Sequence, residues 1–150
     1  MEIERKYLVK TLPDGYMSFP SCSIEQAYLC AEPVVRIRKE DHRYYLTYKS
    51  KGLLEREEYN LPLTKEAYAH LLSKADGMIL TKRRYRIPIT DTCLTIELDI
   101  FSGAYEGLCL AEVEFGSRQE AERFVPPAWF GADVTFSGEY QNSRLALRKA

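Results

Sequence analysis

Charged residues recur at alternate positions along several short stretches of this chain, and the pairs share a sign. In EIERK, Glu2, Glu4 and Lys6 fall on one face of an extended chain, because successive side chains of a strand point to opposite sides. The same spacing gives the pairs Glu2/Glu4, Arg36/Arg38, Lys82/Arg84, Glu97/Asp99 and Glu112/Glu114. Such residues lie about 7 Å apart, where like charges repel by about 2 kcal/mol at an effective dielectric of about 20. A sheet selected only for solubility would mix the signs, so the charged faces indicate a binding function.

The two signs suit two kinds of ligand. The positive residues of the pattern are Lys6, Arg36, Arg38, Lys49, Arg56, Lys82, Arg84 and Arg86, and the negative ones are Glu2, Glu4, Glu58, Glu97, Asp99, Glu112 and Glu114. Enclosed charges are costly unless each has a partner. A bound polyanion would compensate the positive charges. The carboxylates, hard oxygen donors without nitrogen or sulfur donors nearby, suit Mg²⁺ or Mn²⁺. The pattern therefore predicts a phosphate chain held together with divalent metal.

Strand patterns dominate the elements that must position these residues. Alternation and turn residues predict strands over 2–9, 24–30, 34–39, 43–50, 55–61, 79–87, 93–101 and 107–115. Capping residues predict helices over 65–75 and 118–124, a third pattern covers 140–149, and 125–133 is interpreted as a link. Short turns between strands favour antiparallel pairing. We expect a mainly β, α+β fold: an eight-stranded antiparallel closed barrel with a charged lumen and helices packed outside.

Length and composition restrict the function classes. The 150 residues, 45% of them hydrophobic, predict a single domain over 1–150. A formal net charge of −1 argues against a nucleic-acid binder, and no apolar run approaches the length that spans a membrane. The cysteines show no metal spacing and are expected to be reduced, as in a cytoplasmic protein; they are Cys22, Cys30, Cys93 and Cys109. The expected partner is a small polyphosphate, and a homodimer is left open.

Several stretches together resemble a known family. EIERKY is similar to the E-x-E-x-K signature of the CYTH superfamily, the triphosphate tunnel metalloenzymes. RIRKEDHRYYLTYKSKG, REEY, KRRYRI, ELDIFSGAYEGLCLAEVEF and EYQNSRLA follow in the order of that family, so the resemblance covers nearly the whole chain. It implies an eight-stranded antiparallel tunnel and metal-dependent hydrolysis or cyclisation of triphosphate compounds.

The resemblance also implies roles for individual residues. The phosphates would be bound by Lys6, Arg36, Arg38, Lys49, Lys82 and Arg84, and metal would be held by Glu2, Glu4, Asp99, Glu112 and Glu114. We assign Glu4, Glu2 and Lys6 as catalytic, with a carboxylate of the two Glu-x-Glu pairs orienting the attacking water. Glu58, Arg56, Arg86 and Glu97 stay open between substrate or metal contacts and ion pairing. Asn60 stands where many family members have a second glutamate.

The expected function is metal-dependent hydrolysis of inorganic triphosphate or another small triphosphate. An adenylyl cyclase or a thiamine triphosphatase of the same fold are alternatives. A polyphosphate- or nucleotide-binding module is the alternative without catalysis, and it would not need the acidic residues. Arg5, Arg43 and Arg83 fall on the opposite strand faces and are expected to be surface charges, while Trp129 and Phe130 are expected to pack in the core.

Overall fold

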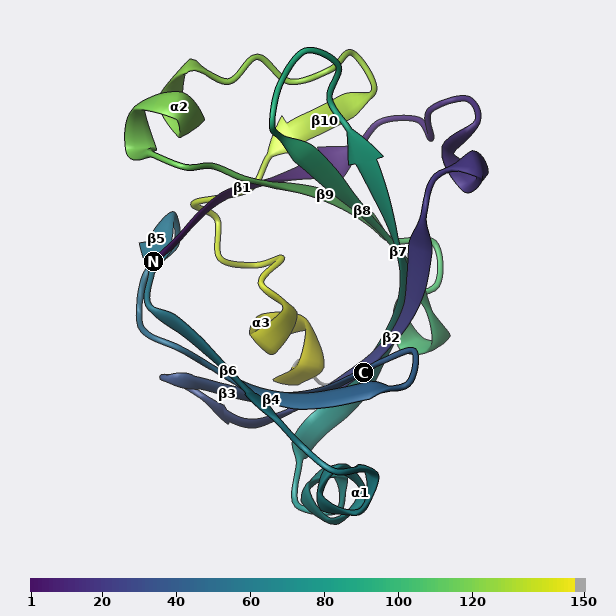
Figure 1. Cartoon of the computed structure of the whole chain (residues 1–150), viewed down its shortest axis with the longest axis vertical. Coiled ribbons are helices and arrows are strands. Elements are labelled where there is room, and N and C mark those ends of the chain that lie inside the picture. The colour runs from purple at the N-terminus through teal and green to yellow at the C-terminus, as the bar shows by residue number, and fades with distance from the viewer. Residues whose placement is uncertain (148–150) are drawn as a thin grey trace.

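The computed structural model describes residues 1–147 and is built around one antiparallel sheet (Figure 1). Its strands follow the order β10-β1-β9-β8-β7-β2-β3-β4-β6, and β5 pairs with β1. Their bounds are β1 Glu2–Val9, β2 Ser21–Ala31, β3 Val34–Glu40, β4 Arg43–Lys49, β5 Glu55–Arg56, β6 Glu58–Pro62, β7 Asp76–Pro88, β8 Thr95–Ser102, β9 Cys109–Glu114 and β10 Phe130–Asp133. Two short 3₁₀ turns, η1 Tyr16–Ser18 and η2 Gly103–Tyr105, complete the connections.

The sheet curls until its ends nearly meet, because β6 continues directly from β5, which pairs back onto β1. The mainly β, antiparallel barrel with a charged interior is therefore confirmed. The strand count differs from eight for two local reasons. The predicted strand 55–61 is divided at Glu57 into β5 and β6, which pair with different neighbours. The predicted link 125–133 contains a further strand, β10.

The prediction of a plain link over 125–133 is wrong for its second half. Phe130 pairs with Val9 and Asp133 pairs with Tyr7, so β10 extends the outer edge of β1. Phe130 is buried beside Tyr7, with 4.8 Å between their ring centroids. A four-residue strand behind two prolines has too little alternation to be recognised, and only its pairing with β1 makes it a strand.

Two of the three helices cover the outside of the barrel (Figure 1). Helix α1, Lys65–Leu72, begins at the Thr64 side-chain cap and buries Tyr68 against Ala27 and Ile37. Helix α2, Arg118–Arg123, begins at the predicted Ser117 cap; a core of Tyr7, Leu98, Val113 and other apolar residues lies between it and the sheet. None of the helices in residues 1–147 is long and apolar enough to cross a bilayer.

The third helix, α3, lies elsewhere. It spans Asn142–Leu147, within the predicted 140–149, of which 148 and 149 lie outside the described residues. In Figure 1 it appears inside the ring of strands, and Asn142 contacts side chains from β2 and β7 that point into the barrel. Leu145 and Ala146 are buried against Leu110 and neighbouring residues. Helix α3 therefore packs at one end of the barrel, with Asn142 toward the cavity and with Leu145 and Ala146 in the apolar core.

Candidate active site

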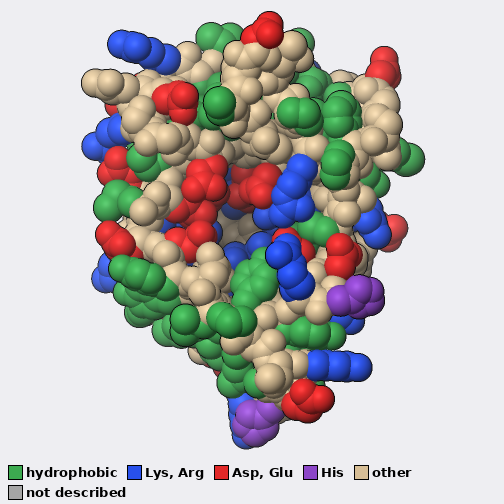
Figure 2. Space-filling view, in the orientation of Figure 1, with side chains coloured by type: hydrophobic (Ala, Val, Ile, Leu, Met, Phe, Trp, Pro, Cys, Tyr) green, Lys and Arg blue, Asp and Glu red, His purple; other side chains and the backbone are tan. Residues whose placement is uncertain are grey.

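A cavity of about 680 Å³ occupies the interior of the barrel. Its lining includes every candidate residue from the sequence except Asp99, together with the first residues of α3. Figure 2 looks into this hollow: acidic side chains gather along one side of the opening, and basic side chains lie inside and along the opposite side. The predicted candidates thus come together in space, drawn from both halves of the chain.

Strand alternation and register bring the charged side chains together. Along β1, Glu2, Glu4 and Lys6 line the cavity, while Tyr7 on the opposite face is buried in the core on the other side. Strands β1 and β9 pair Glu4 with Glu114 and Lys6 with Glu112. The first pair sets two carboxylates directly opposite each other, an arrangement that is destabilising without a cation.

The arginines of β3 form the basic wall and are held by uncharged partners. Arg36 donates from Nη2 to Thr47 Oγ1 at 3.2 Å, and Arg38 donates from Nε to Gln26 Oε1 at 2.8 Å. Thr47 donates in turn to Asn60 Oδ1 at 2.6 Å. The Nε of Arg36 is buried and has no hydrogen-bond partner in the described part of the chain. Burial and the neighbouring Arg36 lower the pKa of Arg38. The positive charge of Arg36 and Arg38 is therefore not offset at hydrogen-bond distance by any carboxylate among residues 1–147.

Lys82 and Arg84 of β7 are held differently, by a carboxylate behind the cavity surface. Asp99 accepts from Arg84 Nε at 2.7 Å and Nη2 at 2.9 Å, and from Lys82 Nζ at 2.7 Å. Although burial acts against ionisation, these two cations lower the pKa of Asp99 to about 2. Burial lowers the pKa of Lys82 to about 7, against the attraction of Asp99. Both oxygens of Asp99 are thus occupied by cations.

A second ion-pair group surrounds Lys49. Its Nζ lies 3.0 Å from Glu2 Oε1 and 3.3 Å from Glu58 Oε2, and Arg56 Nε lies 3.7 Å from Glu2. Burial raises the pKa of Glu2, whereas the hydrogen bond from Glu2 and the Lys49 charge outweigh burial and lower that of Glu58 to about 2. Glu58 and Arg56, whose roles the sequence left open, thus form ion pairs in this structure.

Glu4 lacks comparable compensation. Glu112 has Lys6 Nζ at 3.3 Å, and despite burial that cation holds its pKa well below the ordinary value. The nearest cation contact of Glu4 is Arg56 Nη2, at 4.0 Å. Burial and the charge of Glu112 raise the pKa of Glu4 to about 8, and burial and Glu58 raise that of Glu114. Glu4 on β1 and Glu114 on β9 therefore face the cavity with carboxylates whose charged form is unfavourable.

These carboxylates suit a divalent ion that is only partly ligated by protein. Their donors are hard oxygens, and an ion between Glu4 and its neighbours would offset the burial and the Glu112 charge that together raise the pKa of Glu4. Within residues 1–147, no three acidic, histidine or cysteine side chains converge into a complete metal site. Mg²⁺ commonly binds through one or two carboxylates, with waters and substrate phosphates as its other ligands. The residues present fit that mode.

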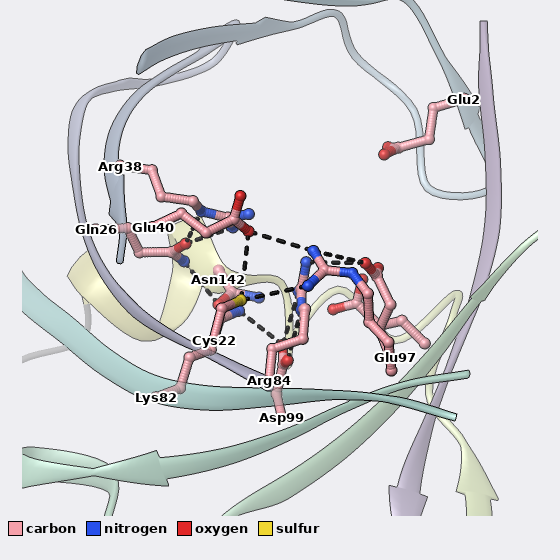
Figure 3. Close-up of polar contacts among 12 residues, drawn as sticks. Glu2, Cys22, Gln26, Arg38, Glu40, Lys82, Arg84, Glu97, Asp99 and Asn142 are labelled. Atoms are coloured by element: carbon pink, nitrogen blue, oxygen red, sulfur yellow. Dashed lines mark hydrogen bonds and ion pairs between the residues drawn. The ribbon is translucent and has the colours of Figure 1, made fainter. Parts of the chain in front are cut away.

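The structure adds residues that the sequence interpretation missed. Glu40 follows Arg36 and Arg38 at the same alternate spacing and accepts from Arg86 Nη2 at 3.3 Å and Arg43 Nη2 at 3.1 Å. The alternate spacing along β3 could have identified Glu40 from the sequence. Gln26 and Asn142 complete the network in Figure 3, and neither belongs to a charge pattern. Their positions follow from cross-strand register and from the docking of α3.

The residues assigned to the opposite faces have more definite roles than surface charge. Arg43 lines the rim of the cavity, although 78% of its side chain is exposed. Arg5 donates to the carbonyl of Ala121 at 2.8 Å and to Asp133 at 2.6 Å, so it ties α2 and β10 to β1. Arg83 donates to a serine hydroxyl on the outer face. Trp129 and Phe130 pack in the core, as expected.

Comparison with known proteins identifies the family. Residues 1–128 match the model of the CYTH domain. The chain belongs to the CYTH domain family. It is 38% identical to the inorganic triphosphatase of Nitrosomonas europaea, over 97% of each chain. It is 33% identical to the inorganic triphosphatase of Acetivibrio thermocellus, over 96% of this chain and 92% of that protein. The crystal structure of the inorganic triphosphatase NE1496 is 36% identical with a TM-score of 0.74, over 99% of this chain and 96% of that one.

The predicted family membership is therefore confirmed, and both curated relatives are named for a hydrolase activity, in agreement with the prediction of an enzyme. The CYTH domain match ends before β10 and α3. The side chains that α3 contributes to the cavity thus lie beyond the matched residues.

Proposed function

We propose that residues 1–150 form one domain, a cytoplasmic enzyme that hydrolyses inorganic triphosphate with the aid of Mg²⁺ or Mn²⁺. The observation that carries the proposal is that one cavity has a basic side and an acidic side. Arg36 and Arg38 form a basic wall with neutral supports, and the largely buried Glu4 on the acidic side has no cation closer than Arg56 at 4.0 Å. A phosphate chain needs the first and a divalent ion needs the second. The inorganic triphosphatase relatives support this substrate.

In this proposal the basic residues hold the phosphate chain in line. The guanidinium groups of Arg36, Arg38 and Arg84 suit bidentate contact with phosphate oxygens, and Lys6, Lys49 and Lys82 provide point charges between them. Their anchoring hydrogen bonds fix these groups before substrate arrives. Phosphoryl transfer needs mainly such positioning and charge neutralisation, because little covalent chemistry is required from the protein.

The acidic residues complete the arrangement. Glu4, Glu112 and Glu114 would hold the divalent ion together with substrate phosphate oxygens. Glu2 instead forms an ion pair with Lys49, and Asp99 forms one with Lys82. When bound, the ion neutralises charge on the phosphate oxygens and lowers the pKa of a water that it binds. Glu4 would accept a hydrogen bond from the attacking water, with Glu2 beside it. Lys6, fixed by Glu112 and the carbonyl of Tyr140, would neutralise charge on the phosphate chain.

The test is phosphate release from inorganic triphosphate, thiamine triphosphate and ATP, each with Mg²⁺, Mn²⁺ or EDTA, with ATP also examined for cyclic product. We expect metal-dependent release chiefly from inorganic triphosphate, and a loss of about 100-fold or more in kcat for Glu4→Gln. Arg5→Met, on the outer face, is the matched control and should retain turnover. Cyclic nucleotide without phosphate release would assign the chain to the cyclase alternative. Tight binding without turnover would assign it to the binding module.

A further inference from the structure

Two uncharged amides join two of the cavity cations into one chain of hydrogen bonds. Gln26 Oε1 accepts from Nε and Nη2 of Arg38, and Gln26 Nε2 donates to Asn142 Oδ1 at 2.8 Å. Asn142 Oδ1 also accepts from Lys82 Nζ at 2.9 Å. Figure 3 shows this chain running from β3 through β2 and α3 to β7. We propose that Gln26 and Asn142 are positioning residues that orient Arg38 and Lys82 toward triphosphate without adding a negative charge of their own.

The hydrogen-bond directions fix both amides. Because Arg38 and Lys82 can only donate, the amide oxygens of Gln26 and Asn142 must face them. Gln26 then directs its NH₂ group to Asn142, and no alternative orientation satisfies both neighbours. Gln26 is fully buried. It occupies one edge of the Arg38 guanidinium, Nε and Nη2, and leaves Nη1 for an anion.

The neutral character of these supports matters as much as their geometry. Arg84 in the same cavity is held by Asp99 at equally short distances, and that carboxylate offsets its charge. A carboxylate in place of Gln26 would hold Arg38 with equal or better hydrogen bonds. An amide gives the orientation without the compensating charge. The buried, unpartnered Nε of Arg36, the next inward-facing residue on β3, is independent evidence that this wall is organised for an anion.

Asn142 makes the arrangement depend on α3. It is the first residue of that helix, beyond the residues matched by the CYTH domain model. Leu145 and Ala146 anchor the helix in the apolar core of the barrel end, so removing the Asn142 amide should leave α3 in place. The docked helix thus contributes an oxygen to Lys82 that the sheet alone does not provide.

The experiment separates orientation from charge. Gln26→Glu and Asn142→Asp keep an acceptor for each cation but add a negative charge. Gln141→Glu is the matched control, because Gln141 also lines the cavity and no side-chain hydrogen bond joins it to Arg38 or Lys82. The full-length variants are titrated with inorganic triphosphate in EDTA by calorimetry. Their kcat and KM are then measured with Mg²⁺, and their melting temperatures with and without the anion.

This inference rests on the proposed function. We expect Gln26→Glu and Asn142→Asp to weaken triphosphate binding and raise KM by about tenfold or more, with kcat changed less than about threefold and folding retained. Gln141→Glu should change affinity by less than about threefold. Unchanged affinity in Asn142→Asp, or in a folded Gln26→Glu, would show a merely structural role and overturn the inference. If the wild-type chain itself does not bind triphosphate, the proposed function fails, and this inference with it.

Discussion

Replacing Asp99 by asparagine removes the carboxylate that holds Lys82 and Arg84, and this change should destabilise the protein strongly. The Asp99 side chain is fully buried, as is that of Lys82, and only 7% of the Arg84 side chain is exposed. Asparagine keeps the size but offers one oxygen where three short donor contacts now end. Lys82 would then lack its close counter-charge, and Arg84 would keep only the partly exposed Glu97 at 3.2 Å.

The magnitude follows from the buried position. The pKa of Asp99 is lowered from 3.8 to about 2, which corresponds to about 2 kcal/mol of stability. Because the folded pKa is depressed, this contribution is complete at pH 7 and is lost as the pH falls from about 4 toward 2. Breaking a buried pair also leaves its partners uncompensated, and such changes cost about 3–5 kcal/mol. We therefore expect Asp99→Asn to lower the free energy of unfolding by about 3–5 kcal/mol.

Urea denaturation at pH 7 in EDTA measures this change. Glu97→Gln is the control, because Glu97 contacts the same Arg84 at 3.2 Å but has 29% of its side chain exposed. We expect the control to lose about 1 kcal/mol or less. Inorganic triphosphate should stabilise Asp99→Asn more than the wild-type protein, since it replaces the missing negative charge. Equal losses in the two variants would refute the argument that burial of the ion pairs decides their energy.

Three further predictions concern protons and the outer face. In EDTA the free energy of unfolding should fall as the pH rises from about 4.5 to about 8, because the pKa of Glu4 is raised in the fold; Glu4→Gln should flatten this dependence, and an unchanged curve would contradict the assignment. Binding of triphosphate at pH 8 should take up a proton at Lys82, whose pKa is about 7 without substrate; calorimetry in buffers of different ionisation enthalpy should show less uptake in Lys82→Arg. Arg5→Met should lower the melting temperature but not kcat, because it unties Ala121 and Asp133 outside the cavity; reduced kcat in the folded variant would argue against that separation.

Much of the barrel was predictable because strand alternation is a local property. The stretches 34–39 and 79–87 mark β3 and β7 to within a few residues, and the caps at Thr64 and Ser117 locate the starts of α1 and α2. The strand β10 was not predictable, since its four residues become a strand only by pairing with β1. The place of α3 was equally hidden, because a short amphipathic helix can cover either the outside or the end of a barrel.

The candidate site divides in the same way. Like-signed residues at alternate positions indicated which side chains face the cavity, because a strand keeps its even and odd residues on opposite sides. Alternation alone does not tell which charges pair. Asp99 shares the spacing of the other acidic residues, yet the structure turns it to Lys82 and Arg84 behind the cavity lining. Gln26 and Asn142 carry no charge, so the alternation of charged residues could not identify them.

The amino-acid sequence by itself determined most of the strands, their inward faces, the excess of like charges on those faces and the resemblance to a family. These properties are readable because they depend on neighbours one to four residues apart. Only the tertiary structure decided the charge balance of each side chain: Glu4 without a close cation, Arg38 on an amide, Asp99 between two cations. The reason is that compensation depends on distances of about 3 Å between residues far apart in the chain, set by register, barrel closure and the docking of α3.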